Sequence, residues 1–161
     1  GGDYCHPFIN PNPFAPPGLK SVREIVQENN INVSNYQLIM VMVNFPCPTI
    51  DGYSTVGASA EPLIVNGQSY LKPFTWLNRL PTLTNTTAPP FTRFEYVIAH
   101  ELGHNLGVFH ANSWFCGLQQ DPIYGAGCQH VEYGNSYDVM GNPIWTFDFN
   151  AVFKEFYGLY A

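Results

Sequence analysis

The sequence predicts a single α/β (α+β) domain spanning residues 1–161. A helical pattern over Leu19–Gln27 is followed by a nearly continuous apolar run from Tyr36 to Phe45, and a helix leading into a buried strand is typical of layered α/β folds. A second amphipathic pattern, residues 92–106, carries histidines. Because only 11% of the residues are charged and 16% are aromatic, we expect a compact globule with its own core.

The charge and hydropathy of the chain exclude two classes of partner. The net charge of −6 argues against nucleic acid or an anionic membrane surface. The longest apolar run, Leu38–Val43, is far shorter than the roughly 20 residues of a membrane-spanning helix. The chain begins at Gly1 without an initiator methionine or a signal sequence, so we expect a processed form or a fragment.

The first half is expected to alternate between helix and strand. Prolines at five positions predict an extended arm over the surface for residues 1–17. Leu19–Gln27 then has its apolar residues at helical spacing, and Tyr36–Phe45 is rich in β-branched residues, which favours a central strand covered on both faces. Asp51–Ser59 is expected to be partly extended.

The clearest turn signal is the pair Asn66-Gly67, which fits a type I′ turn. It lies between the short runs Pro62–Val65 and Gln68–Leu71 and therefore predicts a β-hairpin. We interpret Pro73–Pro90 as a loop because it is rich in turn-forming residues.

Thr92 and Glu95 form a predicted capping box that opens the histidine-bearing helix. One side of this helix is apolar and is expected to dock on the core, through Phe94, Ile98, Leu102 and Leu106. The opposite side carries the histidines.

The C-terminal third is expected to hold a long connection and a last helix. We interpret Ala111–Tyr137 as a loop without regular structure, with His130 as a surface or hydrogen-bonded residue. Phe149–Tyr157 shows helical spacing, with Asn150 as its cap and Gly158 as its end.

Residues 100–110 read H-E-x-x-H-x-x-G-x-x-H, which predicts a zinc site. His100 and His104 are four residues apart, so both point from one face of a helix. Gly107 can adopt a left-handed conformation that ends the helix and brings His110 round as the third ligand. Glu101 is not needed as a ligand and is expected to act as the general base that takes a proton from water.

This motif and the sequence around it resemble the metzincin zinc endopeptidases. The motif is followed thirty residues later by Tyr137-Asp138-Val139-Met140-Gly141, which is similar to the methionine turn of that group. Within it, Ala111, the run 132–135 and the tail Phe149–Lys154 resemble the gametolysin-like peptidases (peptidase family M11). The resemblance covers roughly Gly18 to Leu159.

The resemblance implies a metzincin-type mixed, mostly parallel sheet with an active-site helix, a Met-turn and a C-terminal helix. It also implies that Met140 forms an apolar floor under the three imidazoles and that Asp138 hydrogen-bonds nearby. An edge strand near the predicted hairpin would pair with the substrate. The expected wall of the specificity pocket is the segment after the methionine, Asn142, Pro143, Ile144 and Trp145.

Four cysteines fit two disulfides and an oxidising compartment, so we expect a secreted protein. We favour Cys116 with Cys128, since both lie between the third histidine and Met140, and this leaves Cys5 with Cys47. Reduced thiols are an alternative, and so is an inhibitory Cys5 thiolate on the metal, as in some metzincin pro-segments. The sequons at Asn32 and Asn85 predict glycosylation in a eukaryotic source.

These observations predict a secreted endopeptidase with one Zn²⁺ per chain and a protein or peptide substrate. The alternative is a non-catalytic structural or binding module that keeps zinc on a metzincin scaffold.

Metzincins usually begin with a strand before the first helix, whereas only the proline-rich arm precedes Leu19 here. We therefore expect the first strand to be missing here and to come from a preceding fragment of the same precursor or from a separate chain, unless this protein dispenses with it. Without that strand a sheet edge would be left with unpaired backbone groups.

Overall fold

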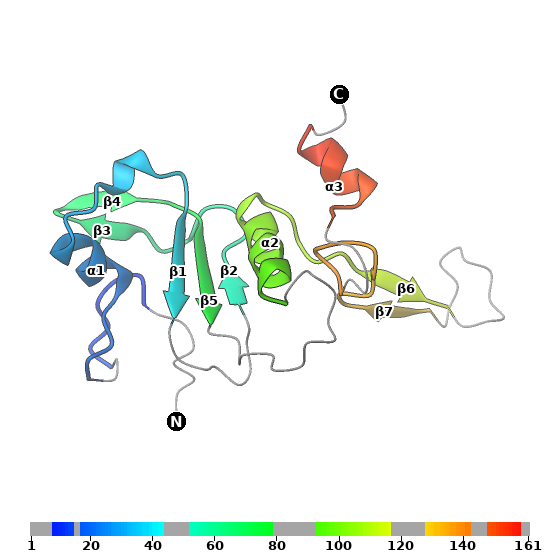
Figure 1. Cartoon of the computed structure of the whole chain (residues 1–161), viewed down its shortest axis with the longest axis horizontal. Coiled ribbons are helices and arrows are strands. Elements are labelled where there is room, and N and C mark those ends of the chain that lie inside the picture. Colours follow the sequence, from blue (N-terminus) through cyan, green and yellow to red (C-terminus); the bar gives the residue numbers. More distant parts are fainter. Residues whose placement is uncertain are drawn as a thin grey trace. The chain divides into compact units, whose positions relative to one another are not determined.

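The computed structural model describes residues 8–14, 17–43, 52–78, 93–116, 128–142 and 148–158. The chain divides into two compact units, residues 1–107 and 108–161. The described residues form a mixed α and β structure with three α-helices and small sheets (Figure 1). This agrees with the predicted α/β class at a coarse level.

The first helix, α1 (Val22–Glu28), begins at a capping box. The Ser21 side chain accepts a hydrogen bond from the Glu24 amide, and the Glu24 carboxylate accepts one from the Ser21 amide. The helix therefore starts three residues later than the apolar spacing predicted, because Ser21 satisfies the first free amides.

The described part of the N-terminal arm is not confined to the surface, which corrects the expectation for residues 1–17. Ile9 is buried in the core cluster. The carbonyls of Phe8 and Ile9 accept hydrogen bonds from the first amides of α1, those of Val22 and Arg23. The arm thus completes the N-terminus of the helix while its prolines keep it out of regular structure.

A three-stranded sheet lies at the centre of the first unit, in the order β1 (Ile39–Val43), β5 (Phe74–Asn78), β2 (Gly52–Ser54). β5 runs parallel to β1 and antiparallel to β2. The expected loop Pro73–Pro90 is therefore wrong in its first part, since β5 is the middle strand. All five residues of β5 are buried, and β-branched and aromatic side chains suit such a strand.

β1 was expected to be a central strand but lies at one edge of the described sheet. Its side chains alternate between half-buried and exposed, and Met42 is 65% exposed. The apolar run therefore predicted the strand correctly, but the prediction that both of its faces are buried was wrong. Among the described ladders, β1 with β5 is parallel and the other three are antiparallel, so the described sheets are mixed.

The predicted hairpin is present as β3 (Leu63–Val65) and β4 (Gln68–Tyr70). Asn66 and Gly67 have φ values of 50° and 79°, as a type I′ turn requires. In Figure 1 the hairpin and α1 lie on one side of the three-stranded sheet and α2 on the other. A 3₁₀ turn, Val33–Asn35, leads from α1 towards β1.

α2 (Arg93–Asn105) packs on β2 and β5. Its buried stripe is formed by Val97, Glu101 and Asn105, at positions i, i+4 and i+8. Ile98 and Leu102 are only half-buried and Leu106 is 51% exposed, which corrects the predicted docking stripe. The Phe94 side chain and the predicted cap at Thr92 lie outside the described residues.

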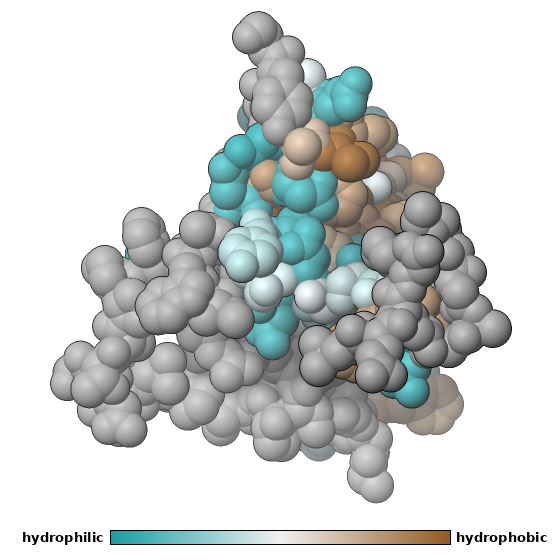
Figure 2. All heavy atoms as spheres, turned by 90° about the vertical axis from the view of Figure 1, so that its right-hand side faces the viewer, coloured by the Kyte–Doolittle hydropathy of each residue, from teal (hydrophilic) through white to brown (hydrophobic). Residues whose placement is uncertain are grey.

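The second unit contains a hairpin that the sequence did not predict. β6 (Ser113–Phe115) pairs with β7 (Gln129–Val131) inside the stretch expected to lack structure. Cys116 and Cys128 form a disulfide directly beyond the paired residues, as expected. β7 is exposed, and His130 packs edge-on against Trp114, which agrees with its predicted surface position. Figure 2 shows the molecule from the right-hand side of Figure 1, and many of the described residues on this face are hydrophilic (teal).

The last helix, α3 (Ala151–Phe156), begins at the predicted cap. The Asn150 side chain accepts a hydrogen bond from the Phe153 amide at 3.0 Å. Gly158 follows with a φ of +66°, so the left-handed residue that ends the helix is also the predicted one.

Candidate metal centre

His100 and His104 are held by the C-terminal half of α2. Both side chains are buried, and their rings meet edge-on with centroids 4.9 Å apart. This arrangement follows from the helix, because residues four apart lie one above the other on the same face. The predicted pair of histidines therefore shares one site.

The Tyr96 ring also reaches this site and was not predicted. It lies one helical turn before His100, and its hydroxyl oxygen is 3.5 Å from Nδ1 of His100. The two rings pack edge-on at 5.6 Å. The i, i+4 spacing of Tyr96 and His100 was the sequence signal that could have found this contact.

Gly107 ends α2 in the way the motif predicted. Its φ is +100°, and its amide donates to the His104 carbonyl at 2.8 Å. Only glycine adopts this left-handed conformation at little cost. The chain then continues to His110 without further helix.

His110 belongs to the second unit and is half-buried there. Its Nδ1 lies 2.7 Å from Oε1 of Glu132, and its ring lies 3.7 Å, centroid to centroid, from the Tyr133 ring. A carboxylate oxygen accepts and does not donate, so Nδ1 carries the hydrogen and Nε2 keeps a lone pair for a ligand bond. Glu132 thus orients the third histidine, a role that the sequence reasoning missed.

Together the three histidines could hold a metal ion. The ligating atoms of His100, His104 and His110 all lie within 4.8 Å of one another. Imidazole nitrogens suit zinc, copper, iron and nickel. The donor set therefore fits a transition metal, and the expected Zn²⁺ is one of the ions that it would accept.

Glu101 is buried beside the histidines on the same helix. Desolvation by burial raises the pKa of its carboxyl to about 7, and a hydrogen bond with the Ser54 side chain opposes this rise. Its Oε2 has no hydrogen-bond partner among the described residues. A buried carboxyl with one uncommitted oxygen is suited to exchange a proton with a bound reactant.

A buried polar chain below α2 connects Glu101 to the sheet. Ser54 of β2 meets Glu101 and also lies 2.7 Å from the Thr75 hydroxyl. Thr75 in turn donates to Oδ1 of Asn105 at 2.6 Å. The Asn105 amide donates to the backbone carbonyls of Thr55 and Phe74. This network fixes the orientation of α2, and no motif in the sequence identified it.

Met140 and Asp138 organise a buried turn in the second unit. Met140 is fully buried, and its carbonyl accepts from the Ala111 amide at 2.8 Å. Asp138 accepts from the amides of Met140 and Asn150, at 2.7 Å and 2.9 Å. The carboxylate therefore joins the turn at Met140 to the start of α3.

Several predicted site residues fall outside the described part of the chain. These are Pro143, Ile144, Trp145, Cys5, Cys47 and Asn85. Asn142, the first residue of the expected specificity wall, is exposed. Asn32 is exposed too, and its Oδ1 accepts from both the amide and the hydroxyl of Ser34.

No family model matches this chain, and neither a curated protein nor a solved structure matches it. Among the described residues no helix is long and apolar enough to cross a membrane. Within the described chain, the three histidines could hold a metal ion and Glu101 has a raised pKa.

Proposed function

We propose that the chain is a secreted, zinc-dependent endopeptidase of the metzincin type. The observation that carries the proposal is the placing of a buried carboxyl, Glu101, next to His100 on the helix that supplies two histidines of the cluster. A closed structural zinc site has no use for such a group, so this observation favours a catalytic site over a structural module.

His100, His104 and His110 would hold the zinc ion, which when bound supplies Lewis-acid activation of water and of the scissile carbonyl. Glu101 takes the proton of the attacking water on its carboxylate and passes it to the leaving amine. Burial suits Glu101 to both steps, because desolvation raises the pKa of the carboxyl towards neutral pH.

Secretion is supported by the disulfide between Cys116 and Cys128, since such bonds form and persist in oxidising compartments. The resemblance to metzincins implies that the segment after Met140, namely Asn142, Pro143, Ile144 and Trp145, would favour a hydrophobic side chain after the scissile bond. A cleavage profile of a peptide library measures this preference, and a profile dominated by acidic residues at that position would refute the wall.

The proposal is tested by hydrolysis of casein or gelatin. We expect cleavage that a chelator abolishes and added Zn²⁺ restores. Glu101→Gln should keep one zinc per chain and lose turnover, because it removes the proton acceptor alone. Glu95→Gln is the matched control, an exposed glutamate on the same helix, and should cleave normally.

Metal analysis separates the ligands from the base. Replacing His110 with Ala should abolish zinc binding or greatly lower the zinc affinity, because only two of the three protein ligands remain. Full zinc occupancy in His110→Ala would disprove the three-histidine site. A Glu101→Gln protein that still hydrolyses casein would show that Glu101 is not the proton acceptor, and a zinc-loaded parent protein that does not hydrolyse casein would favour the non-catalytic alternative.

A further inference from the structure

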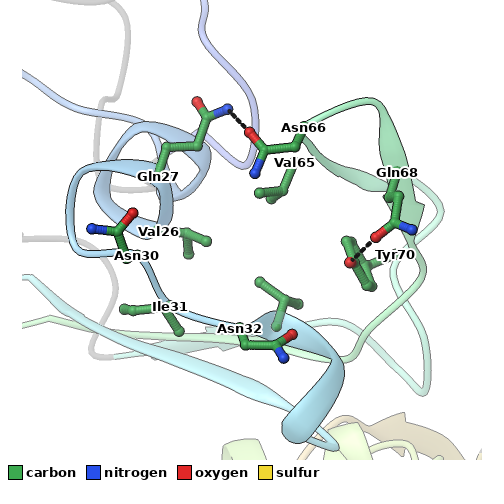
Figure 3. Close-up of a pocket in the computed structure, with 10 residues that line it drawn as sticks. Val26, Gln27, Asn30, Ile31, Asn32, Val65, Asn66, Gln68 and Tyr70 are labelled. Carbon is green, nitrogen blue, oxygen red and sulfur yellow. Dashed lines mark hydrogen bonds between the residues drawn. The ribbon is translucent and has the colours of Figure 1, made fainter.

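A pocket of about 360 Å³ opens between α1, the turn that follows it and the β3–β4 hairpin (Figure 3). Its volume lies near the lower end of the range for small-molecule sites, about 300–1,000 Å³. Val26, Val33 and Val65 are buried and form an apolar floor. In Figure 1 these elements lie across the sheet from α2, so the pocket is separate from His100 and His104.

The rim of the pocket is unusual in its chemistry. It carries carboxamides from α1, the following turn and the hairpin, together with one phenol. They are Gln27, Asn30, Asn32, Asn66, Gln68 and Tyr70. None of the described residues that line the pocket has a charged side chain. An ionised ligand such as a phosphate or a carboxylate would therefore lose its hydration without gaining a counter-charge.

The carboxamides keep hydrogen-bonding groups for a ligand. Gln68 accepts from the Tyr70 hydroxyl at 2.6 Å, and Asn66 accepts a long bond of 3.4 Å from Gln27. These bonds use the oxygens of Gln68 and Asn66 and leave their amide nitrogens as donors, while Gln27 keeps its oxygen as an acceptor. Figure 3 shows these groups around the same opening.

We propose that this pocket binds a neutral saccharide. Sugar hydroxyls both donate and accept, and carboxamides offer both functions on one side chain. The apolar face of a sugar ring can pack on the valine floor and on Tyr70. A peptide fits less well, because β3 and β4 use their facing backbone groups in their own ladder and the pocket offers side-chain amides instead.

Two sources of saccharide fit this chemistry. One is a free glycan or a glycan on another protein. The other is the chain's own glycan, because Asn32 lies on the rim and begins a sequon with Ser34. The proposal does not rest on peptidase activity, and its test measures binding alone.

The test uses the unglycosylated, ¹⁵N-labelled chain and observes its side-chain amide signals by NMR. The probes are glucose, galactose, mannose, N-acetylglucosamine and their disaccharides at millimolar concentrations. We expect at least one probe to shift the Gln27, Asn66 and Gln68 signals saturably. Gln68→Ala should weaken that binding about tenfold, because hydrogen bonds to the ligand are lost. Gln37→Ala is the control, an exposed glutamine outside the pocket, and should bind normally.

A second arm distinguishes the sources. If the Asn32 glycan occupies the pocket, glycosylated protein from a eukaryotic secretory host will not bind the added probe until the glycan is removed. If the ligand is external, both forms will bind it. The proposal is overturned if no probe shifts these signals, if Gln68→Ala binds as tightly as the parent, or if an extended neutral peptide is bound in place of every sugar.

Discussion

Gly52 of β2 lies directly against Glu101 of α2, with no room for a side chain between them. A Cβ built at Gly52 would come 2.9 Å from both Cγ and Oε1 of Glu101 and 2.8 Å from Cγ1 of Val97. Such distances are shorter than ordinary van der Waals contact. The absence of a side chain at this position therefore allows α2 to approach the sheet and bury Glu101.

We predict that Gly52→Ala displaces Glu101. Forcing a methyl group into this contact should cost about 1–3 kcal/mol in the free energy of unfolding. It should also reduce peptide hydrolysis by more than the loss of folded protein explains, because the carboxyl moves. Urea denaturation and turnover per folded molecule measure the two effects.

Gly57→Ala is the control for this substitution. A Cβ at Gly57 meets nothing within 4 Å, but the residue has a φ of +67°. The variant should lose about 1–2 kcal/mol through backbone strain alone and keep its turnover per folded molecule. Equal turnover in both variants would show that the contact between Gly52 and Glu101 does not set the position of the carboxyl.

The polar chain from Ser54 through Thr75 to Asn105 supports a second prediction. Thr75→Val keeps the shape of the side chain but leaves Oδ1 of the buried Asn105 without its donor. An unsatisfied buried acceptor costs about 1–3 kcal/mol, so the unfolding midpoint should fall accordingly. Thr75→Ser retains the hydroxyl and should recover most of the loss. If Thr75→Val were as stable as the parent protein, the network would not hold α2 on the sheet.

Local signals in the sequence were sufficient for several features of the fold and the site. The histidine spacing, the left-handed Gly107, the Asn66-Gly67 turn and the Asn150 cap each depend on a few neighbouring residues. Their conformations are fixed by backbone sterics and by helix geometry. They could therefore be predicted without knowledge of the tertiary structure.

Features that depend on distant contacts could not be predicted in this way. Phe74–Asn78 becomes the middle strand because Phe74 and Trp76 join the core cluster that also holds Val22 and Val26 of α1, while Thr75 donates a hydrogen bond to Asn105 of α2. The same contacts bury Glu101 and Asn105 and leave the more apolar Leu106 exposed. A pattern of hydrophobic residues cannot identify a face that is buried by polar groups.

The β6–β7 hairpin was missed for a different reason. The three residues of β7 are all exposed, so the sequence shows no alternation of buried and exposed positions. The disulfide between Cys116 and Cys128 joins the ends of the two strands. A pairing that is stabilised by a covalent bond needs little apolar burial, and hence leaves little hydrophobic signal.

The hydrogen bond between His110 and Glu132 supports a third prediction. Glu132→Ala should weaken the binding of Zn²⁺ by roughly 10–100-fold, since the partner of a ligating histidine fixes its ring and its tautomer. The measurement is competition for zinc against a chromophoric chelator, which needs no substrate. Glu132→Gln keeps an acceptor oxygen and should lose less affinity. Glu155→Ala, which removes an exposed carboxylate of α3, is the control for charge. If it lowered the zinc affinity as much as Glu132→Ala does, the effect would come from net charge alone.

The fourth prediction concerns Gly141, the residue after Met140. A Cβ there would lie 1.9 Å from the carbonyl oxygen of Asn135 and 3.2 Å from that of Ala111. Both are backbone atoms, so neither can rotate away. The Ala111 carbonyl also accepts from the Asn135 amide, and the Ala111 amide donates to Met140. These bonds hold three segments of the second unit together around Gly141.

Gly141→Ala should therefore disrupt the packing of the second unit and lower its free energy of unfolding by at least about 3 kcal/mol. Amide hydrogen exchange checks this residue by residue: protection should disappear at Ala111, Asn135 and Val139 and persist in β5 of the first unit. Gly158→Ala is the matched variant, because its φ is +66° but a Cβ there meets nothing within 4 Å. It should lose only about 1–2 kcal/mol through strain. Parental protection at Ala111 and Asn135 in Gly141→Ala would show that the backbone around Met140 can move aside and that the close packing at Gly141 does not hold the second unit together.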